Sequence, residues 1–150
     1  MLVKDIMTRK VVSIGPQEST LTACQEYKKN GVGCLIVKQE NLVVGILTER
    51  DIIERIILDE RDPKATRVED IMSRNIKTVH ASASIELATQ MMKDYNIKKL
   101  PVVLNNEIVG IITATDIANR VPQLARELQP PLDQDKPYRF LSEPAETETP

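Results

Sequence analysis

The sequence predicts an α/β (α+β) protein made of two βαββα units that pack as a pseudo-twofold pair. The first observation is an internal repeat: Val3–Met7 aligns with Val68–Met72, and the same register continues without a gap to Arg55 and Arg120. The second is that each copy passes from strand spacing to helix spacing and back in the same order. Helix patterning does not produce so many identities in one register. The chain therefore contains two copies of one structural unit.

The repeat sets the expected domain limits. The first unit covers residues 1–60, a charged connector covers 61–67, the second unit covers 68–122, and 123–150 form a proline-rich tail. A repeat of about 55 residues has little surface to bury alone, so the two copies are expected to pack through their sheets and to leave two equivalent clefts between them.

Each predicted element has a local signal. In the first copy, Val11, Val12 and Ile14 form a short strand that ends at a Gly-Pro turn. Ser19 caps a helix that stops at Asn30-Gly31, where glycine accepts the left-handed conformation. The apolar stripes predicted on this helix and its counterpart are Leu21, Cys24 and Tyr27 in the first copy and Leu87, Met91 and Tyr95 in the second.

Two strands and a helix complete each unit. The first copy has strands over 34–38 and 42–47 and a helix over 49–58. The second copy has strands over 100–104 and 108–112 and a helix over 114–121. The tail is too rich in proline and polar residues to extend the core, and its last ten or so residues are expected to be mobile. Its scarce large apolar residues are expected to dock on the body or on a second chain: Tyr138, Phe140 and Leu141.

The composition narrows the functional class. A net charge of -2 and a pI of about 5.5 give no field that would attract nucleic acid or anionic lipid. Cys24 and Cys34 are not spaced as a metal knuckle, and His80 is the only histidine, so neither a zinc site nor a histidine dyad is expected. No apolar stretch approaches the roughly 20 residues that span a bilayer, and no signal-peptide layout is present, which predicts a cytoplasmic protein.

One motif recurs where the last strand of each unit meets its last helix. It is Gly-h-h-Thr-x-x-Asp, where h is hydrophobic, at Gly45–Asp51 and at Gly110–Asp116. Thr and Asp at this spacing form a capping box, which alone would account for both residues. Recurrence directly after a strand also favours a phosphate site, with the carboxylate accepting hydrogen bonds from ribose hydroxyls. The residues leave both interpretations open.

With these motifs the chain resembles a tandem pair of cystathionine-β-synthase (CBS) domains, the regulatory pair called a Bateman module. The resemblance covers about residues 2–122. It is carried by five stretches: Asp5–Thr8, Gly45–Asp51, Asp70–Ser73, Leu100–Val103 and Gly110–Asp116.

The resemblance implies two nucleotide sites, in which one unit holds adenine and the other supplies Thr and Asp. What we name the Asp116 site would use Val11, Val12, Gly33 and Cys34 with Thr113, Thr115 and Asp116. What we name the Asp51 site would use Ile76, Lys77, Lys98 and Lys99 with Thr48, Arg50 and Asp51. Because the Asp51 site gathers more basic residues, it is expected to favour the more highly charged ligand.

The expected function is regulatory, with AMP, ADP or ATP as the ligand and no cofactor. The sequence shows no nucleophile–base pair, Walker loop or metal cluster, so an enzyme is not expected, although phosphate hydrolysis stays a weaker hypothesis. An S-adenosylmethionine sensor and a ligand-free oligomerisation scaffold are also compatible with these residues. Output would act on a separate effector protein. Apolar residues on the helices predict a homodimer, chiefly Ile52, Ile53, Ile56 and Ile57.

Overall fold

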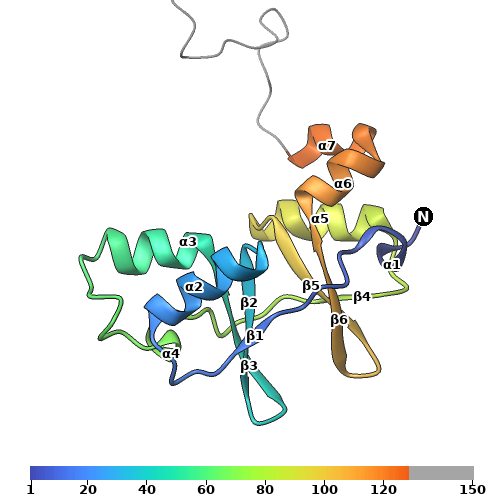
Figure 1. Cartoon of the computed structure of the whole chain (residues 1–150). Helices are drawn as coiled ribbons and strands as arrows, with labels where there is room; N and C mark the ends of the chain where they lie inside the picture. Colours follow the sequence, from blue (N-terminus) through green and yellow to red (C-terminus); the bar gives the residue numbers. More distant parts are fainter. Residues whose placement is uncertain (129–150) are drawn as a thin grey trace, which may run out of the picture.

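The structure is a computed structural model that describes residues 1–128 as two three-stranded sheets with helices packed on them (Figure 1). Residues 129–150 are outside the described part, and so are the predictions made for the end of the tail and for Tyr138, Phe140 and Leu141.

The predicted order of strand, helix, strand, strand, helix is confirmed in both units. The first unit contains β1 (Ser13–Ile14), α2 (Thr20–Asn30), β2 (Cys34–Gln39), β3 (Leu42–Thr48), α3 (Glu49–Ile52) and a π-helical turn, η1 (Ile53–Ile57). The second contains β4 (Val79–His80), α5 (Ile85–Tyr95), β5 (Lys99–Leu104), β6 (Glu107–Thr113) and α6 (Ala114–Arg120). In each sheet the first strand runs parallel to the central strand, and the third runs antiparallel to it.

The predicted caps delimit the long helix of each unit. The Ser19 hydroxyl accepts a hydrogen bond from the Thr22 N–H at 3.1 Å, and Gly31 ends α2 with a φ of 63°. Ser84 caps α5 in the same way, and Asn96 ends it in the left-handed conformation with a φ of 52°. These two helices therefore begin and end where short-range chemistry places them.

The short helix that opens each copy packs on the other copy. In α1 (Val3–Ile6), both apolar side chains belong to the core of the second unit, and the Val3 N–H donates to the Ala83 carbonyl at 2.9 Å. In α4 (Val68–Ile71), the apolar side chains belong to the core of the first unit, and the Val68 N–H donates to the Glu18 carbonyl at 2.9 Å. Each core is thus completed by the opening segment of the other repeat.

The segment after each short helix crosses the last strand of the other unit. Thr8 exchanges two backbone hydrogen bonds with Ile111 at 2.8 and 2.9 Å, and Ser73 exchanges two with Ile46, both at 2.9 Å. A side chain at Gly45, next to the second crossing, would lie 2.5 Å from Met72 Sδ. Glycine in the repeated motif therefore lets the two chain segments approach each other.

A small apolar cluster joins the two sheets. Its buried members are Cys34, Ile36, Ile46 and Ile111, and partly buried side chains pack around them, among them Val11 and Ile76. These residues come from both units, so the pair is held together through its sheets as the repeat predicts.

The stripes predicted on the long helices are right only in part: Tyr27 and Met91 pack against the two cores, but the most buried positions are others. Leu87 and Tyr95 are 50% and 49% exposed, and α5 instead buries Ile85, Ala88 and Met92. These positions follow helical spacing along a neighbouring face, the one that faces the sheet. The same shift occurs in α2, where the buried residues are Thr20 and Ala23 while Leu21, Cys24 and Tyr27 are half-buried.

Two boundaries also differ from the prediction. Val11 and Val12 precede β1, which covers Ser13 and Ile14, although the Val12 carbonyl still accepts a hydrogen bond from the Ile36 N–H of β2 at 3.0 Å. The tail begins with a further helix, α7 (Pro122–Leu128), whose Leu124 and Leu128 pack on the core of the second unit. The beginning of the tail therefore does extend the core, because its two leucines lie one turn apart on one face of a helix.

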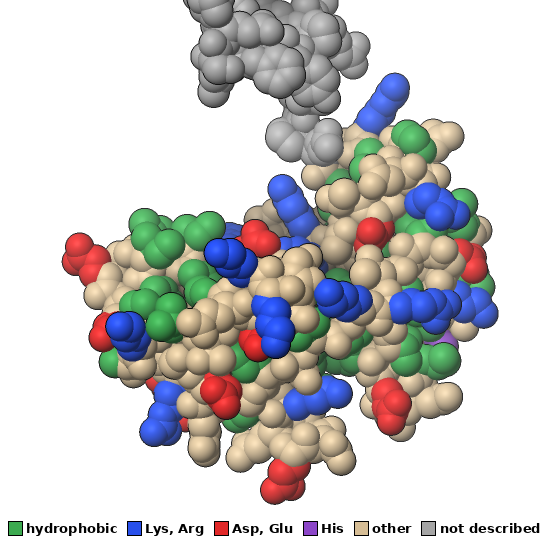
Figure 2. Space-filling model, viewed as in Figure 1, with side chains coloured by type: hydrophobic (Ala, Val, Ile, Leu, Met, Phe, Trp, Pro, Cys, Tyr) green, Lys and Arg blue, Asp and Glu red, His purple; other side chains and the backbone are tan. Residues whose placement is uncertain are grey.

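The first unit has no counterpart of α7 within residues 1–128, and its helical face stays open. Ile53, Ile57 and Leu58 are 51%, 62% and 69% exposed. Figure 2 shows hydrophobic side chains over the region where Figure 1 places α3. We call these three residues the Ile57 patch. In the same described range, no helix combines the length and apolarity needed to cross a membrane.

Candidate functional site

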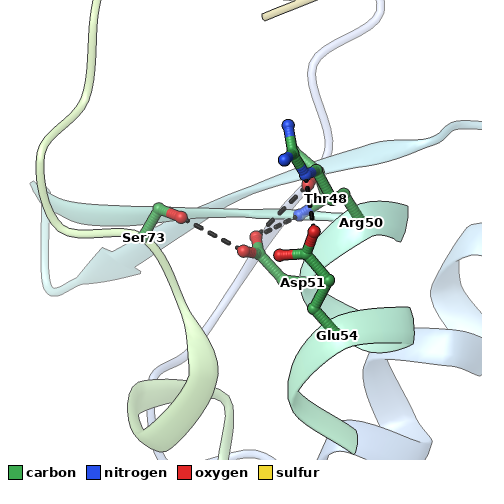
Figure 3. Close-up of polar contacts among 5 residues, drawn as sticks. All are labelled: Thr48, Arg50, Asp51, Glu54 and Ser73. Atoms are coloured by element: carbon green, nitrogen blue, oxygen red, sulfur yellow. Dashed lines mark hydrogen bonds and ion pairs between the residues drawn. The ribbon is translucent and has the colours of Figure 1, made fainter. Parts of the chain in front are cut away.

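Asp51 is the most contacted carboxylate of the two repeated motifs. Its Oδ2 accepts hydrogen bonds from the Thr48 N–H at 2.9 Å and the Thr48 hydroxyl at 3.3 Å. Its Oδ1 accepts from the Ser73 hydroxyl at 3.1 Å, so the contact joins the two units (Figure 3). The side chain is only 6% exposed. The buried charge is thereby surrounded by donors, as a carboxylate in the interior requires.

Asp116 holds the same position in the second unit but has fewer partners. Its Oδ2 accepts from the Thr113 N–H at 2.9 Å, and its own N–H donates to the Thr113 hydroxyl at 3.0 Å, which completes a capping box. No hydrogen bond within residues 1–128 reaches its Oδ1, and the residue is half-buried. The capping interpretation is confirmed, and the ligand role of both aspartates stays a prediction.

Ser73 and Arg55 make contacts between the units that their equivalents in the other repeat, Thr8 and Arg120, do not make within residues 1–128. Thr8, which replaces Ser73, is exposed and makes no side-chain hydrogen bond to Asp116. Arg55 Nη1 donates to the carbonyls of Ile71 and Met72 at 2.8 and 3.2 Å, which fastens η1 to the end of α4. Sequence reasoning identified Arg55 only as a repeated residue, because its partners belong to the other copy.

Three of the four basic residues of the Asp51 site already have partners within the chain. Arg50 pairs with Glu54 at 2.8 Å on the helix surface, as Figure 3 shows, and Lys77 lies 4.6 Å from the centre of the Tyr95 ring. Lys99 Nζ donates to the Gly33 carbonyl at 3.2 Å, so it reaches a residue assigned to the Asp116 site. The exposed Lys98 side chain makes no such contact with any residue from 1 to 128.

The expected adenine-side residues divide into two groups. Val11, Cys34 and Ile76 meet in the apolar cluster between the sheets, whereas Val12 packs against the core of the first unit. Burial raises the pKa of the Cys34 thiol to about 11, Lys99 opposes the rise, and Asp51 adds to it. At neutral pH the thiol is therefore protonated and acts as an apolar side chain.

A separate cavity lies between the end of α5, the start of β5 and α7. It has a volume of about 270 Å³, and Met92, Ile97, Lys98 and Leu128 are among its lining residues. Only Lys98 of the predicted site residues lines it. In the described part of the chain, no three His, Cys, Asp or Glu side chains are grouped closely enough to hold a metal ion.

Comparison with known proteins agrees with this architecture. The family model described as "CBS domain" matches twice, over residues 3–58 and 68–123. The CBS domain-containing protein YhcV of Bacillus subtilis (strain 168) is 34% identical over 125 residues, covering 83% of this chain and 87% of YhcV.

Two solved structures are similar to this chain in both fold and sequence. The CBS-domain pair of protein MJ0100, in complex with 5-methylthioadenosine and S-adenosyl-L-methionine, aligns with a TM-score of 0.73 and 29% identity, covering 82% of this chain and 97% of that one. The hexameric CBS-CP12 protein from bloom-forming cyanobacteria aligns with a TM-score of 0.77 and 26% identity, covering 93% and 76%. Two matched domains that fill most of residues 1–128 establish that this chain belongs to the family of CBS-domain pair proteins.

Proposed function

We propose that this chain is a non-catalytic regulatory module that binds an adenosine nucleotide, AMP, ADP or ATP, between its two CBS units. One observation carries the proposal. Val11, Cys34 and Ile76, which are expected to surround adenine, pack in one cluster with Ile46 and Ile111 of the two repeated motifs. Apolar surface for a base and carboxylates for a ribose thus lie at the same interface between the units.

The chemistry of the interface matches the parts of such a ligand. Adenine is a flat, largely apolar ring that gains from contact with aliphatic side chains. A ribose carries two neighbouring hydroxyls, and the carboxylate of a repeated motif can accept hydrogen bonds from both. Lys99, whose Nζ reaches the Gly33 carbonyl, supplies positive charge near the Asp116 site for phosphate groups, and the exposed Thr115 adds a hydroxyl.

A second candidate ligand is S-adenosylmethionine, which shares the adenosine group. The observation in its favour is the related CBS-domain pair of MJ0100, which was solved with that compound and 5-methylthioadenosine. It lacks phosphates, so Lys99 would contribute little to its binding. The third candidate is a scaffold that binds neither.

Calorimetric titration of the full chain with AMP, ADP, ATP and S-adenosylmethionine separates these candidates. A nucleotide sensor binds at least one phosphate-bearing ligand more tightly than S-adenosylmethionine, and its melting temperature rises with ligand. At a free concentration of 100 times Kd the added stability is about 2.7 kcal/mol. If none of the four ligands gives a heat of binding or raises the melting temperature, the scaffold is the candidate that remains. Measurable ATP turnover would contradict the non-catalytic role.

The proposal includes a homodimer that acts on a separate effector protein. The Ile57 patch supports the dimer, because exposed apolar surface of this kind is typical of an interface, and the related CBS-CP12 protein is hexameric. Light scattering of the wild type and of Ile57→Glu tests it: a dimer becomes monomeric with the variant, and a wild type that is monomeric at high micromolar concentration contradicts it.

The free thiols of Cys24 and Cys34 suit a reducing compartment, and we place the module in the cytoplasm.

A further inference from the structure

We infer that the two repeated motifs have different roles: the Asp116 site takes the ribose of the ligand, whereas Asp51 is a structural carboxylate that fastens one unit to the other. The inference rests on the proposed function and specifies which of its two sites is used. It predicts one nucleotide per chain, where the repeat by itself predicts two.

The first step is the hydrogen-bonding capacity of each carboxylate. A carboxylate has about four lone pairs to offer. Asp51 receives three donors, from the Thr48 N–H, the Thr48 hydroxyl and the Ser73 hydroxyl, and both of its oxygens are engaged. Asp116 receives one donor from within residues 1–128, at Oδ2 only. A ribose with two hydroxyls to donate can therefore be accepted by Asp116 without displacing a partner.

The second step is access. Asp51 is only 6% exposed, and Ser73 lies against the carboxylate oxygen that Thr48 leaves open (Figure 3). Two backbone hydrogen bonds between Ser73 and Ile46 fix the main chain at the crossing, which keeps the Ser73 side chain beside Asp51. At the second unit, the equivalent Thr8 is exposed and leaves the Asp116 carboxylate half-buried and open to a ligand.

The third step is the charge around each site. Three of the basic residues assigned to the Asp51 site are used by the chain itself: Arg50 by Glu54, Lys77 by the Tyr95 ring, and Lys99 by the Gly33 carbonyl. A phosphate there would compete with contacts that already exist. At the Asp116 site, the Thr115 hydroxyl is exposed and adjoins the open carboxylate in sequence.

The experiment is a calorimetric titration of the full chain with AMP, comparing Asp116→Asn with Asp51→Asn. Asparagine keeps a side-chain oxygen for the cap but removes the charge that strengthens acceptance from ribose hydroxyls. We expect one equivalent of AMP per wild-type chain, a loss of affinity of about tenfold or more in Asp116→Asn, and less than about twofold change in Asp51→Asn.

A matched variant tests whether the Asp51 site can bind a ligand once its carboxylate has a free oxygen. Ser73→Ala removes the donor from Asp51 Oδ1 without touching either motif, and we expect a second, weaker equivalent of AMP to bind. Melting without ligand gives a readout that does not depend on binding: Asp51→Asn should lower the melting temperature more than Asp116→Asn, because Asp51 has three donors and Asp116 one.

The outcomes separate this inference from the proposed function. A wild type that binds none of the adenosine ligands overturns the proposed function, and this inference with it. A wild type that binds two equivalents, or equal losses of affinity in the two asparagine variants, overturns the division of roles while leaving nucleotide binding in place. An equal fall in melting temperature for both variants contradicts the structural role of Asp51.

Discussion

Replacing Gly45 by alanine tests the close crossing of the two repeats. The added Cβ would lie 2.5 Å from Met72 Sδ, 2.9 Å from Met72 Cγ and 3.1 Å from the Ser73 carbonyl oxygen. The methionine side chain can turn aside, but the Ser73 carbonyl is backbone and pairs with Ile46. The crossing segment must therefore shift away from β3, or β3 must bend.

The expected cost follows from overpacking and from those backbone bonds. Inserting a methyl into a filled core costs about 1–3 kcal/mol, and in a domain of this size each kcal/mol lowers the melting temperature by about 4 °C. Thermal unfolding followed by circular dichroism should thus show a fall of about 4–12 °C.

Gly15→Ala is the matched control, because the new Cβ would meet only Glu18 Cγ at 3.8 Å. Its melting temperature should change by no more than about 2 °C. A Gly45→Ala variant as stable as Gly15→Ala would refute the crossing geometry.

Two further predictions concern residues that join or line the units. Arg55→Met should lower the free energy of unfolding by about 1–2 kcal/mol, since it leaves the carbonyls of Ile71 and Met72 unpaired, whereas Arg120→Met should change it by less than about 0.5 kcal/mol in chemical denaturation. Burial raises the pKa of Cys34 from 9.0 to about 11, so the stability given by its neutral thiol is complete below pH 9 and is lost as the pH rises through 11. Melting temperatures between these pH values should fall less steeply for Cys34→Ala than for wild type, and parallel curves would contradict this.

The parts of the fold that the sequence predicts are those with local signals. The cap at Ser19 and the left-handed end at Gly31 depend on neighbouring residues and are as expected, and the repeat places the same features at Ser84 and Asn96. The packing of α1 and α4 on opposite units was not predicted, because an aligned repeat does not tell which copy a short apolar segment joins.

The helix α7 does have a local signal in the sequence. Pro122 stands at a helix start, where proline is favoured, and Leu124 and Leu128 are four residues apart. The prolines further along the tail favour an irregular chain, and this short pattern is too weak to predict a helix against them.

The site was predicted in part. The motif marks Asp51 and Asp116 as equivalent and predicts their capping contacts. What distinguishes them is long-range: Ser73 reaches Asp51 across 22 residues, and Lys99 reaches Gly33 across 66. Neither contact has a periodicity or spacing that a single sequence reveals, so the unequal chemistry of the two sites required the fold.

The packing of each opening helix on the opposite unit sets the order in which the chain can finish folding during its synthesis. Val3 and Ile6 are made before the strands and helices that bury them, which begin at β4 with Val79. The core of the first unit likewise cannot be completed until Val68 and Ile71 have been made. The opening helix α1 is thus buried late although it precedes the rest of both units, and until translation has passed both repeats the nascent chain has an incomplete core.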